Sequence, residues 1–427
     1  MSNHINSKMS DATANAEASR CLFCFDAPCQ KDCPAGIDVP GFIRRMTQRN
    51  LRGACQLIVR ENPLPWICGV LCPTKRLCAS RCPREFLDRV IDIGGLQAYA
   101  SVEEDHGEMV NPSERLSRKH IAIIGTGPAG LAAISYLSQD GFEIEVFEAE
   151  DYAGGLITCG IPPYKIDKKR AFQEIGRILD RPGISVHLGF RIKYPFELLK
   201  EFDAVFVATG IGGEEIDKKF LKFKNVYPAT EFLKELNKSQ LQGRTFKKNL
   251  GPNVLIIGGG NTALNAAVSA RLLEVPNVTV VYRRTEKEMP AWSHELEMAR
   301  KQGVNFSFLL EPLSFSGSDG KVSQVTFRQT KLGEPGPDGR RRVIPMGAKR
   351  VVMESSSVIL GTGRKKIELK WLKKEKVDHT TGRVEGKNVF LGGEVLHGAG
   401  LIVQAVADGK KAADEIKRLL QERDNQR

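Results

Sequence analysis

The sequence predicts an α/β fold with two doubly wound parallel sheets, preceded by a separate helical unit that is rich in cysteine. Two observations support this prediction. An apolar strand that breaks into a glycine-rich turn and then a helix-like segment occurs twice, at residues 120–130 and 253–263. Nine of the ten cysteines lie between Cys21 and Cys82, ahead of both turns. The chain is therefore expected to combine a cysteine-rich module with two nucleotide-binding domains of the Rossmann type.

Composition and charge exclude several classes of protein. The chain has 427 residues, 41% hydrophobic and 27% charged, which fits a folded protein of two to four domains at roughly 100–200 residues each. The net charge is +12, but the basic residues are spread along the chain without an aromatic-interleaved motif, so no nucleic-acid partner is expected. No run of about 18 apolar residues occurs, and the polar start Met1–Asn15 lacks a signal-peptide core. We therefore expect a cytoplasmic protein with no membrane partner.

The first glycine-rich turn reads GTGPAG at residues 125–130 and follows the predicted strand Ile121–Ile124. This order lets the backbone approach a pyrophosphate closely, and the helix N-terminus that follows stabilises the negative charge. Glu148 ends the next predicted strand, Glu143–Phe147, where a carboxylate can accept hydrogen bonds from ribose hydroxyl groups. A glycine turn required only for packing is the alternative. The residues expected to bind this nucleotide are Gly125, Gly127, Pro128, Ala129, Gly130, Glu148, Gly155 and Leu156.

The second turn reads GGGNTA at residues 258–263, with the alanine that the motif permits at its third position. Arg283 and Arg284 follow the predicted strand Val278–Tyr282, where the first domain has an acidic residue. A guanidinium can pair with a 2′-phosphate that a carboxylate would repel, so NADPH is expected in preference to NADH. A solvated arginine pair is the alternative. The residues expected to bind this cofactor are Gly258, Gly260, Asn261, Thr262, Ala263, Arg283 and Arg284.

Two dinucleotide sites in one chain imply a resident flavin, FAD, and a diffusible nicotinamide cofactor. Hydride then passes from one cofactor to the other, so no catalytic side chain is expected in this part of the chain. Disulfide reductases share the architecture but need a paired redox cysteine beside the flavin. Cys159 has no neighbouring cysteine, so that activity is not expected.

The cysteine spacing indicates iron–sulfur clusters. A first run at ferredoxin-like spacing, followed by Pro34, consists of Cys21, Cys24, Cys29 and Cys33. A second run consists of Cys68, Cys72, Cys78 and Cys82. With Cys55 there are nine candidates, and two tetranuclear clusters need eight ligands. Cys55, in the helix-like segment Gly53–Arg60, is expected in the core, and four-cysteine zinc sites remain the alternative to clusters.

The order of these features predicts three domains. They are an α-helical domain with two [4Fe–4S] clusters at residues 1–110, an FAD-binding domain at 111–245 and 355–427, and an NAD(P)H-binding domain at 246–354. A charged connector is expected at Val102–Lys119, and Ser357–Leu360 is expected to return the chain to the first nucleotide domain. Gly317–Arg341 predicts turns that join short strands, and Gln404–Glu422 predicts a closing helix.

The cysteine-rich segment also resembles a known family. Three segments look like the N-terminal module of dihydropyrimidine dehydrogenase and its bacterial flavoprotein subunit: CLFCFDAPCQKDCP, NPLPWICGVLCPTKRLCASRC, and IDIGGLQ at Ile91–Gln97. The resemblance continues through both glycine-rich turns to Val389–Ala413. The family lies within the glutamate synthase small-subunit-like oxidoreductases. The resemblance therefore implies that a disulfide-reductase-like flavoprotein follows the cluster module in the sequence.

Ligand assignments follow from this resemblance. It implies one cluster on Cys21, Cys24, Cys29 and Cys82, and another on Cys33, Cys72, Cys78 and the unusual ligand Gln97. Cys68 is then a non-ligand. The resemblance also implies flavin contacts at Gly393 and Glu394, where the family normally has a Gly-Asp pair, and at Lys165, where an arginine is more usual.

The resemblance implies an electron-input subunit. Such a subunit oxidises NAD(P)H and passes electrons through two clusters to an FMN-containing partner subunit, on which uracil or thymine is reduced. The small subunit of glutamate synthase and related transhydrogenase flavoproteins are the alternatives, and they usually have an acidic residue in place of Gln97. A structural subunit without cofactors is the non-enzymatic alternative.

Overall fold

The computed structural model describes residues 9–101, 119–214, 216–217, 219–336, 339–363, 369–373 and 375–425. Residues 1–8, nearly all of the expected connector Val102–Lys119 and the expected domain boundary at residue 110 lie outside these ranges. The described chain forms two compact units. The first draws on Met1–Thr158, Pro163–Gly212 and Lys366–Arg427, and the second on Cys159–Pro162 and Gly213–Lys365. No helix in the described ranges has the length and apolar character needed to cross a membrane.

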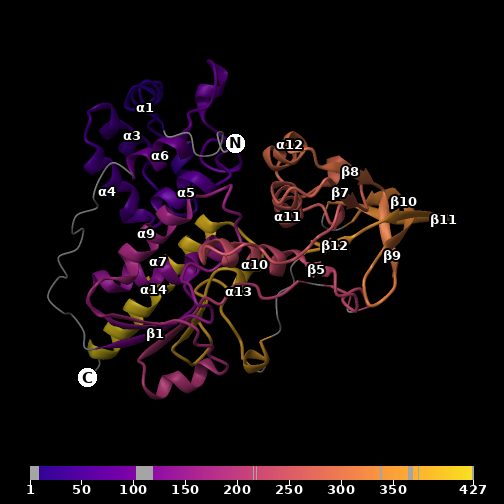
Figure 1. Cartoon of the computed structure of the whole chain (residues 1–427). Coiled ribbons are helices and arrows are strands. Elements are labelled where there is room, and N and C mark those ends of the chain that lie inside the picture. Colours follow the sequence, from indigo (N-terminus) through magenta and orange to yellow (C-terminus); the bar gives the residue numbers. More distant parts are fainter. Residues whose placement is uncertain are drawn as a thin grey trace. The chain divides into compact units, whose positions relative to one another are not determined.

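The cysteine-rich segment folds into short helices, coloured indigo to violet in Figure 1. They are α1 (Asp11–Ala18), α2 (Pro28–Lys31), α3 (Val39–Thr47), α4 (Leu51–Glu61), α5 (Pro65–Leu71) and α6 (Ile93–Ala100), with single 3₁₀ turns η1 at Thr74–Arg76 and η2 at Pro83–Phe86. Side chains accept hydrogen bonds from free N–H groups at four helix starts: Ser10, Asp38, Asn50 and Asp92. Cys55 is buried on α4, as the sequence predicts.

The first parallel sheet has the strand order β13-β4-β1-β2-β3. Its strands are β1 (His120–Ile124), β2 (Glu143–Phe147), β3 (Ile184–His187), β4 (Ala204–Val207) and β13 (Val389–Leu391). Helices α7 (Pro128–Gln139) and α14 (Ile402–Asn425) pack against each other beside this sheet (Figure 1). This part of the chain also contains the short helices α8 (Leu156–Cys159) and α13 (Glu394–His397), the 3₁₀ segment η3 (Pro195–Lys200) and helix α9 (Lys168–Leu179).

The second parallel sheet has the order β5-β12-β6-β7-β8. Its strands are β5 (Val226–Pro228), β6 (Asn253–Ile257), β7 (Asn277–Tyr282), β8 (Asn305–Phe308) and β12 (Ser357–Leu360). The accompanying helices are α10 (Ala229–Leu241), α11 (Asn261–Leu272) and α12 (Ser293–Lys301), with 3₁₀ turns η4 at Glu286–Glu288 and η5 at Lys370–Leu372, the last of these in the first unit.

The path of the returning chain differs from the sequence prediction. Ser357–Leu360 pairs with β6 and β5 in the second sheet, so the expectation that it returns the chain to the first nucleotide domain is wrong. The return strand is β13, which pairs with β4. Both strands are short apolar runs of the kind buried in a parallel sheet, and such runs carry no sign of which sheet they join.

An antiparallel sheet with the order β11-β10-β9 lies between β8 and β12 in the sequence. Its strands are β9 (Leu310–Ser316), β10 (Gln324–Pro335) and β11 (Arg341–Glu354). The prediction of short strands within Gly317–Arg341 is therefore wrong, because β10 runs for 12 residues. Gly333 and Pro335 are accommodated where the β10–β11 register shifts, and such a shift lets turn-forming residues stand inside a strand.

Glu174 connects α9 to the start of α5 within the first unit. Its Oε1 accepts a hydrogen bond from the Trp66 N–H at 2.7 Å, and its Oε2 accepts one from the Ile67 N–H at 2.9 Å. The side chain is buried, and burial raises the pKa of Glu174 to about 7, although the two N–H groups and Arg177 act to lower it. The next residue, Ile175, lies against Gly154 in the loop after β2. Helix α9 therefore connects the cysteine-rich module to the loop after β2.

Candidate functional site

Four cysteines of the N-terminal module face one cavity. They are the four that the family resemblance assigns to a first cluster: Cys21, Cys24, Cys29 and Cys82. The rest of the lining is apolar, from Leu22, Pro28, Val39, Pro40, Ile43, Pro83, Ile91 and Ile93, except for Arg84. Three of the thiols are half-buried and Cys82 is buried. Burial raises the pKa of Cys29 to about 11, with the neighbouring Cys21 and Cys82 adding to the shift.

A second group of thiols lies near Cys33. The pKa of Cys78 rises to about 12 through burial, with a further increase from the proximity of Cys33. The thiol of Cys72 has its pKa raised well above the usual value, first by a hydrogen bond with Cys68 and then by burial. Cys68, which the resemblance makes a non-ligand, therefore lies directly beside Cys72, which the resemblance makes a ligand.

Gln97 on α6 is buried against the start of α5. Its Nε2 donates a hydrogen bond to the Pro65 carbonyl oxygen at 2.7 Å, and the side chain is 7% exposed. Helices α5 and α6 pack so closely that a Cβ atom at Gly69 would lie 2.7 Å from the Ala98 nitrogen. The hydrogen bond fixes the orientation of the amide, which leaves Oε1 as its acceptor atom.

The donor chemistry of both thiol groups fits iron–sulfur clusters. Soft thiolate ligands in a largely apolar surrounding are what such clusters use. Among the described residues, no three cysteine, histidine or acidic side chains converge closely enough to ligate one common ion. The thiolates of a tetranuclear cluster each bind a different iron, so they need only surround a shared cavity. Because thiols ligate metals as thiolates, cluster binding must release the protons that burial holds on these sulfurs.

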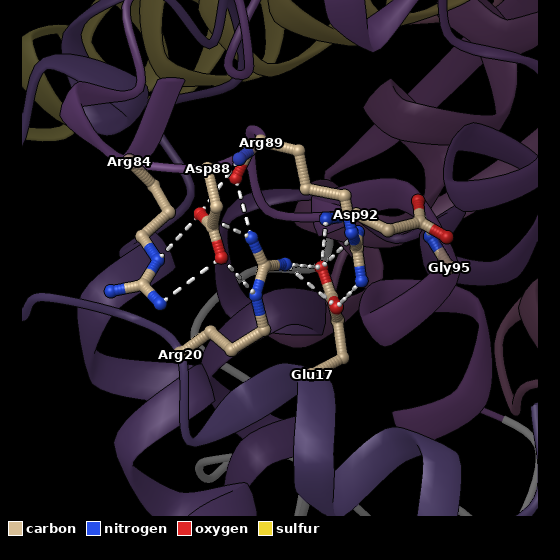
Figure 2. A network of polar contacts seen from close by, with 7 residues as sticks. All are labelled: Glu17, Arg20, Arg84, Asp88, Arg89, Asp92 and Gly95. Atoms are coloured by element: carbon tan, nitrogen blue, oxygen red, sulfur yellow. Dashed lines mark hydrogen bonds and ion pairs between the residues drawn. The ribbon is translucent and has the colours of Figure 1, made fainter. Parts of the chain in front are cut away.

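A network of charged side chains includes Arg84 (Figure 2), which also lines the first cavity. Glu17 is 4% exposed, and its carboxylate accepts hydrogen bonds from Arg20 at 2.7 and 2.8 Å and from Arg89 at 3.1 and 2.6 Å. It also accepts one from the Asp92 N–H at 2.8 Å. These contacts join α1 to the segment between Cys82 and α6. These residues could not be identified from the sequence, because isolated charges far apart in a sequence give no sign that they meet.

The first glycine-rich turn has the geometry of a phosphate cradle. Gly125 has φ +101°, and a Cβ atom there would lie 2.6 Å from the Ala208 carbonyl oxygen. A Cβ atom at Gly130 would lie 1.9 Å from the Gly125 carbonyl oxygen, so only glycine fits. At Gly127, by contrast, a Cβ atom would meet nothing within 4 Å. Because Gly127 precedes α7 and Pro128 begins it, this open space lies at the helix N-terminus, where a pyrophosphate would bind.

Glu148 stands at the end of β2 and holds two loops together. Its Oε2 accepts hydrogen bonds from the Thr126 N–H at 2.9 Å and the Thr126 hydroxyl at 2.5 Å. The same Thr126 oxygen accepts a hydrogen bond from the Gly154 N–H at 3.0 Å. Glu148 therefore fixes the turn in which a ribose and pyrophosphate would lie. Thr126 is not recognisable from the sequence, since the motif allows any residue at that position.

The returning chain reaches the same turn. The Gly393 N–H donates to Asp408 Oδ2 at 2.9 Å, and Gly393 has φ +72° and lies beside Ala129 at the start of α7. Glu394 begins α13, and its Oε1 accepts a hydrogen bond from the Gly400 N–H at 3.4 Å. The structure thus places Gly393 beside the first turn, with Asp408 as the acceptor of its N–H. Two further residues that are expected to bind the flavin lie in other segments. Leu156 begins α8, and Lys165 is half-buried before α9.

The second glycine-rich turn repeats this geometry. A Cβ atom at Gly258 would lie 2.1 Å from the Gly361 carbonyl oxygen, whereas one at Gly260 would meet nothing closer than 4.0 Å. Asn261 and Thr262 begin α11, and Ala263 is buried behind them. Asn261 Oδ1 accepts a hydrogen bond from the Trp292 N–H at 2.9 Å. The turn therefore has its own open cradle at a helix N-terminus.

Arg283 and Arg284 follow β7 as predicted, but they make different contacts. Arg283 is 53% exposed, and its Nη1 lies 3.8 Å from Glu311 Oε1. Arg284 donates through Nε to the Arg341 carbonyl oxygen at 2.7 Å. Arg284 therefore links β7 to β11, and Arg283 is the more available of the two for an anionic ligand.

Comparisons with known proteins agree with this architecture. Residues 1–108 match the family described as "Dihydroprymidine dehydrogenase domain II, 4Fe-4S cluster". Residues 119–409 match the family described as "Pyridine nucleotide-disulphide oxidoreductase".

Curated relatives fall into more than one group at similar identity. The small chain of NADPH glutamate synthase from Escherichia coli K12 is 32% identical over 96% of this chain and 92% of its own length. The NAD-dependent dihydropyrimidine dehydrogenase subunit PreT from Escherichia coli O157:H7 is 32% identical over 95% of this chain and 94% of its own length.

Among solved structures, Mycobacterium tuberculosis FprA in complex with NADPH is similar in fold. It has a TM-score of 0.60 and 18% identity, and the match covers 72% of this chain and 86% of that one. Thioredoxin reductase of T. acidophilum has a TM-score of 0.51 and 20% identity, with 71% of this chain and 99% of that chain covered. At these identities the likeness concerns the fold alone.

Proposed function

Because this chain belongs to the pyridine nucleotide-disulphide oxidoreductase family and is an NAD(P)H-dependent flavin and iron–sulfur oxidoreductase, we propose that it is the electron-input subunit of a dihydropyrimidine dehydrogenase. A single chain has four cysteines around one cavity and also two glycine-rich cradles, and this observation carries the proposal. The partner in this proposal is an FMN-containing subunit that reduces uracil or thymine.

In this proposal the described residues of the chain position cofactors, and none of them is assigned the role of acid, base or nucleophile. A bound FAD would supply two-electron chemistry with NAD(P)H and one-electron chemistry with two [4Fe–4S] clusters. Gly127 and the start of α7 would receive the FAD pyrophosphate, with Glu148 holding the turn. Gly260 and α11 would receive the nicotinamide dinucleotide. The two sets of cysteines in the N-terminal module would hold the two clusters.

The second candidate is the small subunit of a glutamate synthase, since a small chain of that enzyme is as similar to this chain as PreT is. Gln97 favours the pyrimidine proposal, because the family resemblance places an acidic residue there in glutamate synthases. A Glu at this position would place a carboxylate oxygen next to the Pro65 carbonyl oxygen, where the Gln97 Nε2 group now donates a hydrogen bond. The buried contact thus suits an amide.

Anaerobic affinity purification from the native cells, followed by mass spectrometry and a uracil-dependent NAD(P)H oxidation assay, tests the proposal. Co-purification of an FMN protein and turnover of uracil are expected. A large amidotransferase-like partner and turnover of glutamine with 2-oxoglutarate would favour the glutamate synthase candidate instead.

The preference for NADPH is tested at Arg283. Replacing Arg283 with Gln is expected to lower kcat/KM for NADPH by about tenfold and to leave that for NADH nearly unchanged, because a charge-assisted pair with the 2′-phosphate is lost. Lys301→Gln, an exposed charge change on α12, is the control. Equal losses with both cofactors, or a higher kcat/KM for NADH in the unaltered protein, would contradict the preference.

The choice of cluster ligands is tested by iron content. Cys68→Ser is expected to retain about eight iron atoms per chain after anaerobic reconstitution, and Cys72→Ser to retain about four. These residues are four apart along α5 and its C-cap, so the pair controls for local damage. Loss of iron from Cys68→Ser alone would reverse the assignment of ligand and non-ligand.

A further inference from the structure

Arg84 occupies a distinct place beside the first thiol cavity. Within the described part of the chain, it is the one residue of the lining with a permanently charged side chain, among thiols and apolar groups. Its side chain is 23% exposed. A guanidinium at the wall of a largely apolar cavity interacts more strongly with charge inside the cavity than one surrounded by water.

The guanidinium of Arg84 is held in place by Asp88, a residue that does not belong to the lining of the cavity. Arg84 Nε lies 2.9 Å from Asp88 Oδ1, and Nη2 donates to Asp88 Oδ2 at 3.2 Å. Asp88 also accepts a hydrogen bond from Arg20 Nη2 at 2.8 Å, and Arg20 is in turn bound by Glu17 (Figure 2). Because Glu17 is buried, this chain of contacts is anchored in the module. Asp88 is 44% exposed, so water screens its negative charge.

We propose that Arg84 sets the reduction potential of the cluster that binds Cys21, Cys24, Cys29 and Cys82, an inference that rests on the proposed function. Reduction adds one electron to the cluster and forms or breaks no bond, so the cluster becomes more negative by one charge. A fixed positive charge at the cavity wall stabilises the reduced form and raises the potential. Arg84 thereby keeps this cluster able to accept an electron.

Two other arginines nearby serve as comparisons. Arg44 lies near Cys21, but it is exposed, and its guanidinium stands over the ring of Phe23 at 5.2 Å. Arg81 directly precedes Cys82, yet it is 74% exposed and pairs with Asp32 at 3.2 Å. Neither belongs to the lining of the cavity. Arg81 is therefore a matched control, with the same charge and nearly the same place in the sequence.

The test is an anaerobic redox titration followed by electron paramagnetic resonance, using the signal that Cys21→Ser removes. Arg84→Gln is expected to lower the equilibrium constant for one-electron reduction about tenfold, which corresponds to about 59 mV. Arg84→Lys and Arg81→Gln are expected to stay near the unaltered protein. The Lys variant retains the charge, so it also shows whether a failure of the Gln variant to bind iron reflects lost charge or lost packing.

Each outcome bears on a separate claim. Equal potentials in the Gln variant and the unaltered protein, or equal shifts in the Gln and Lys variants, would overturn the role of the Arg84 charge. Persistence of both cluster signals in Cys21→Ser, or no iron–sulfur signal in the unaltered protein, would instead contradict the proposed function.

Discussion

Gly130→Ala is expected to yield protein that purifies without flavin and unfolds more easily by about 3 kcal/mol. The added methyl group would lie 1.9 Å from the Gly125 carbonyl oxygen. The methyl group is attached directly to the backbone of α7 and the oxygen belongs to the backbone of the β1–α7 turn, so no flexible side chain can move aside. Overpacking of this kind costs about 1–3 kcal/mol even where side chains can move, and here only backbone can yield. Flavin absorbance and thermal unfolding of the purified protein measure the two effects.

Gly127→Ala is the matched control for that variant. Its φ is −66°, and a Cβ atom there meets nothing within 4 Å, so the chain itself accepts alanine. The methyl group would stand in the space proposed for the pyrophosphate. We therefore expect normal stability without cofactor but weaker flavin binding. Full flavin content in Gly130→Ala, or in both variants, would show that this turn does not bind the flavin phosphates.

Glu174→Ala is expected to loosen the attachment of the cysteine-rich module, with a loss of about 4 kcal/mol in unfolding free energy at pH 5. The variant leaves the buried N–H groups of Trp66 and Ile67 without acceptors, each at a cost of about 1–3 kcal/mol, and opens a cavity. Hydrogen–deuterium exchange over α5 should accelerate. Gln173→Ala, an exposed neighbour on α9, should change neither quantity.

The effect of Glu174 depends on pH in a defined direction. Because burial raises the pKa of Glu174 to about 7, the folded protein holds this proton more tightly than the unfolded chain does. The stability from this group is complete below about pH 4.5 and is lost as pH rises to about 7, by up to about 3 kcal/mol. The difference between the unaltered protein and Glu174→Ala should shrink over this range. A difference that grows with pH would contradict the assignment.

The sequence predicted the parts of the site that lie within one strand–turn–helix unit. Gly125 and Gly258 are recognisable because a tight turn before a helix restricts the residue types that fit, and both carry positive φ here. The ends of β2 and β12 were predicted correctly for a similar reason, since a buried strand stops where polar or glycine residues begin. Local geometry of this kind is readable from residue order.

Contacts between distant segments could not be predicted in this way. Thr126 and Asp408 support the first turn from positions that no motif marks. Strand β12 joins the second sheet although nothing in its four residues distinguishes the two sheets. The carboxylate of Glu174, buried against α5, looks in the sequence like any acidic residue on a helix. In each case the partner is chosen by tertiary packing.

The measurement that tests the central claim most directly is an anaerobic titration of the reconstituted chain with NADPH, followed by visible absorbance and electron paramagnetic resonance. The proposed route predicts bleaching of the flavin together with the appearance of reduced [4Fe–4S] signals, and loss of the latter alone in a variant that removes both Cys21 and Cys72. Flavin that bleaches while both cysteine groups bind no iron, or clusters that stay oxidised at full flavin reduction, would contradict the transfer of electrons from nicotinamide through flavin to clusters.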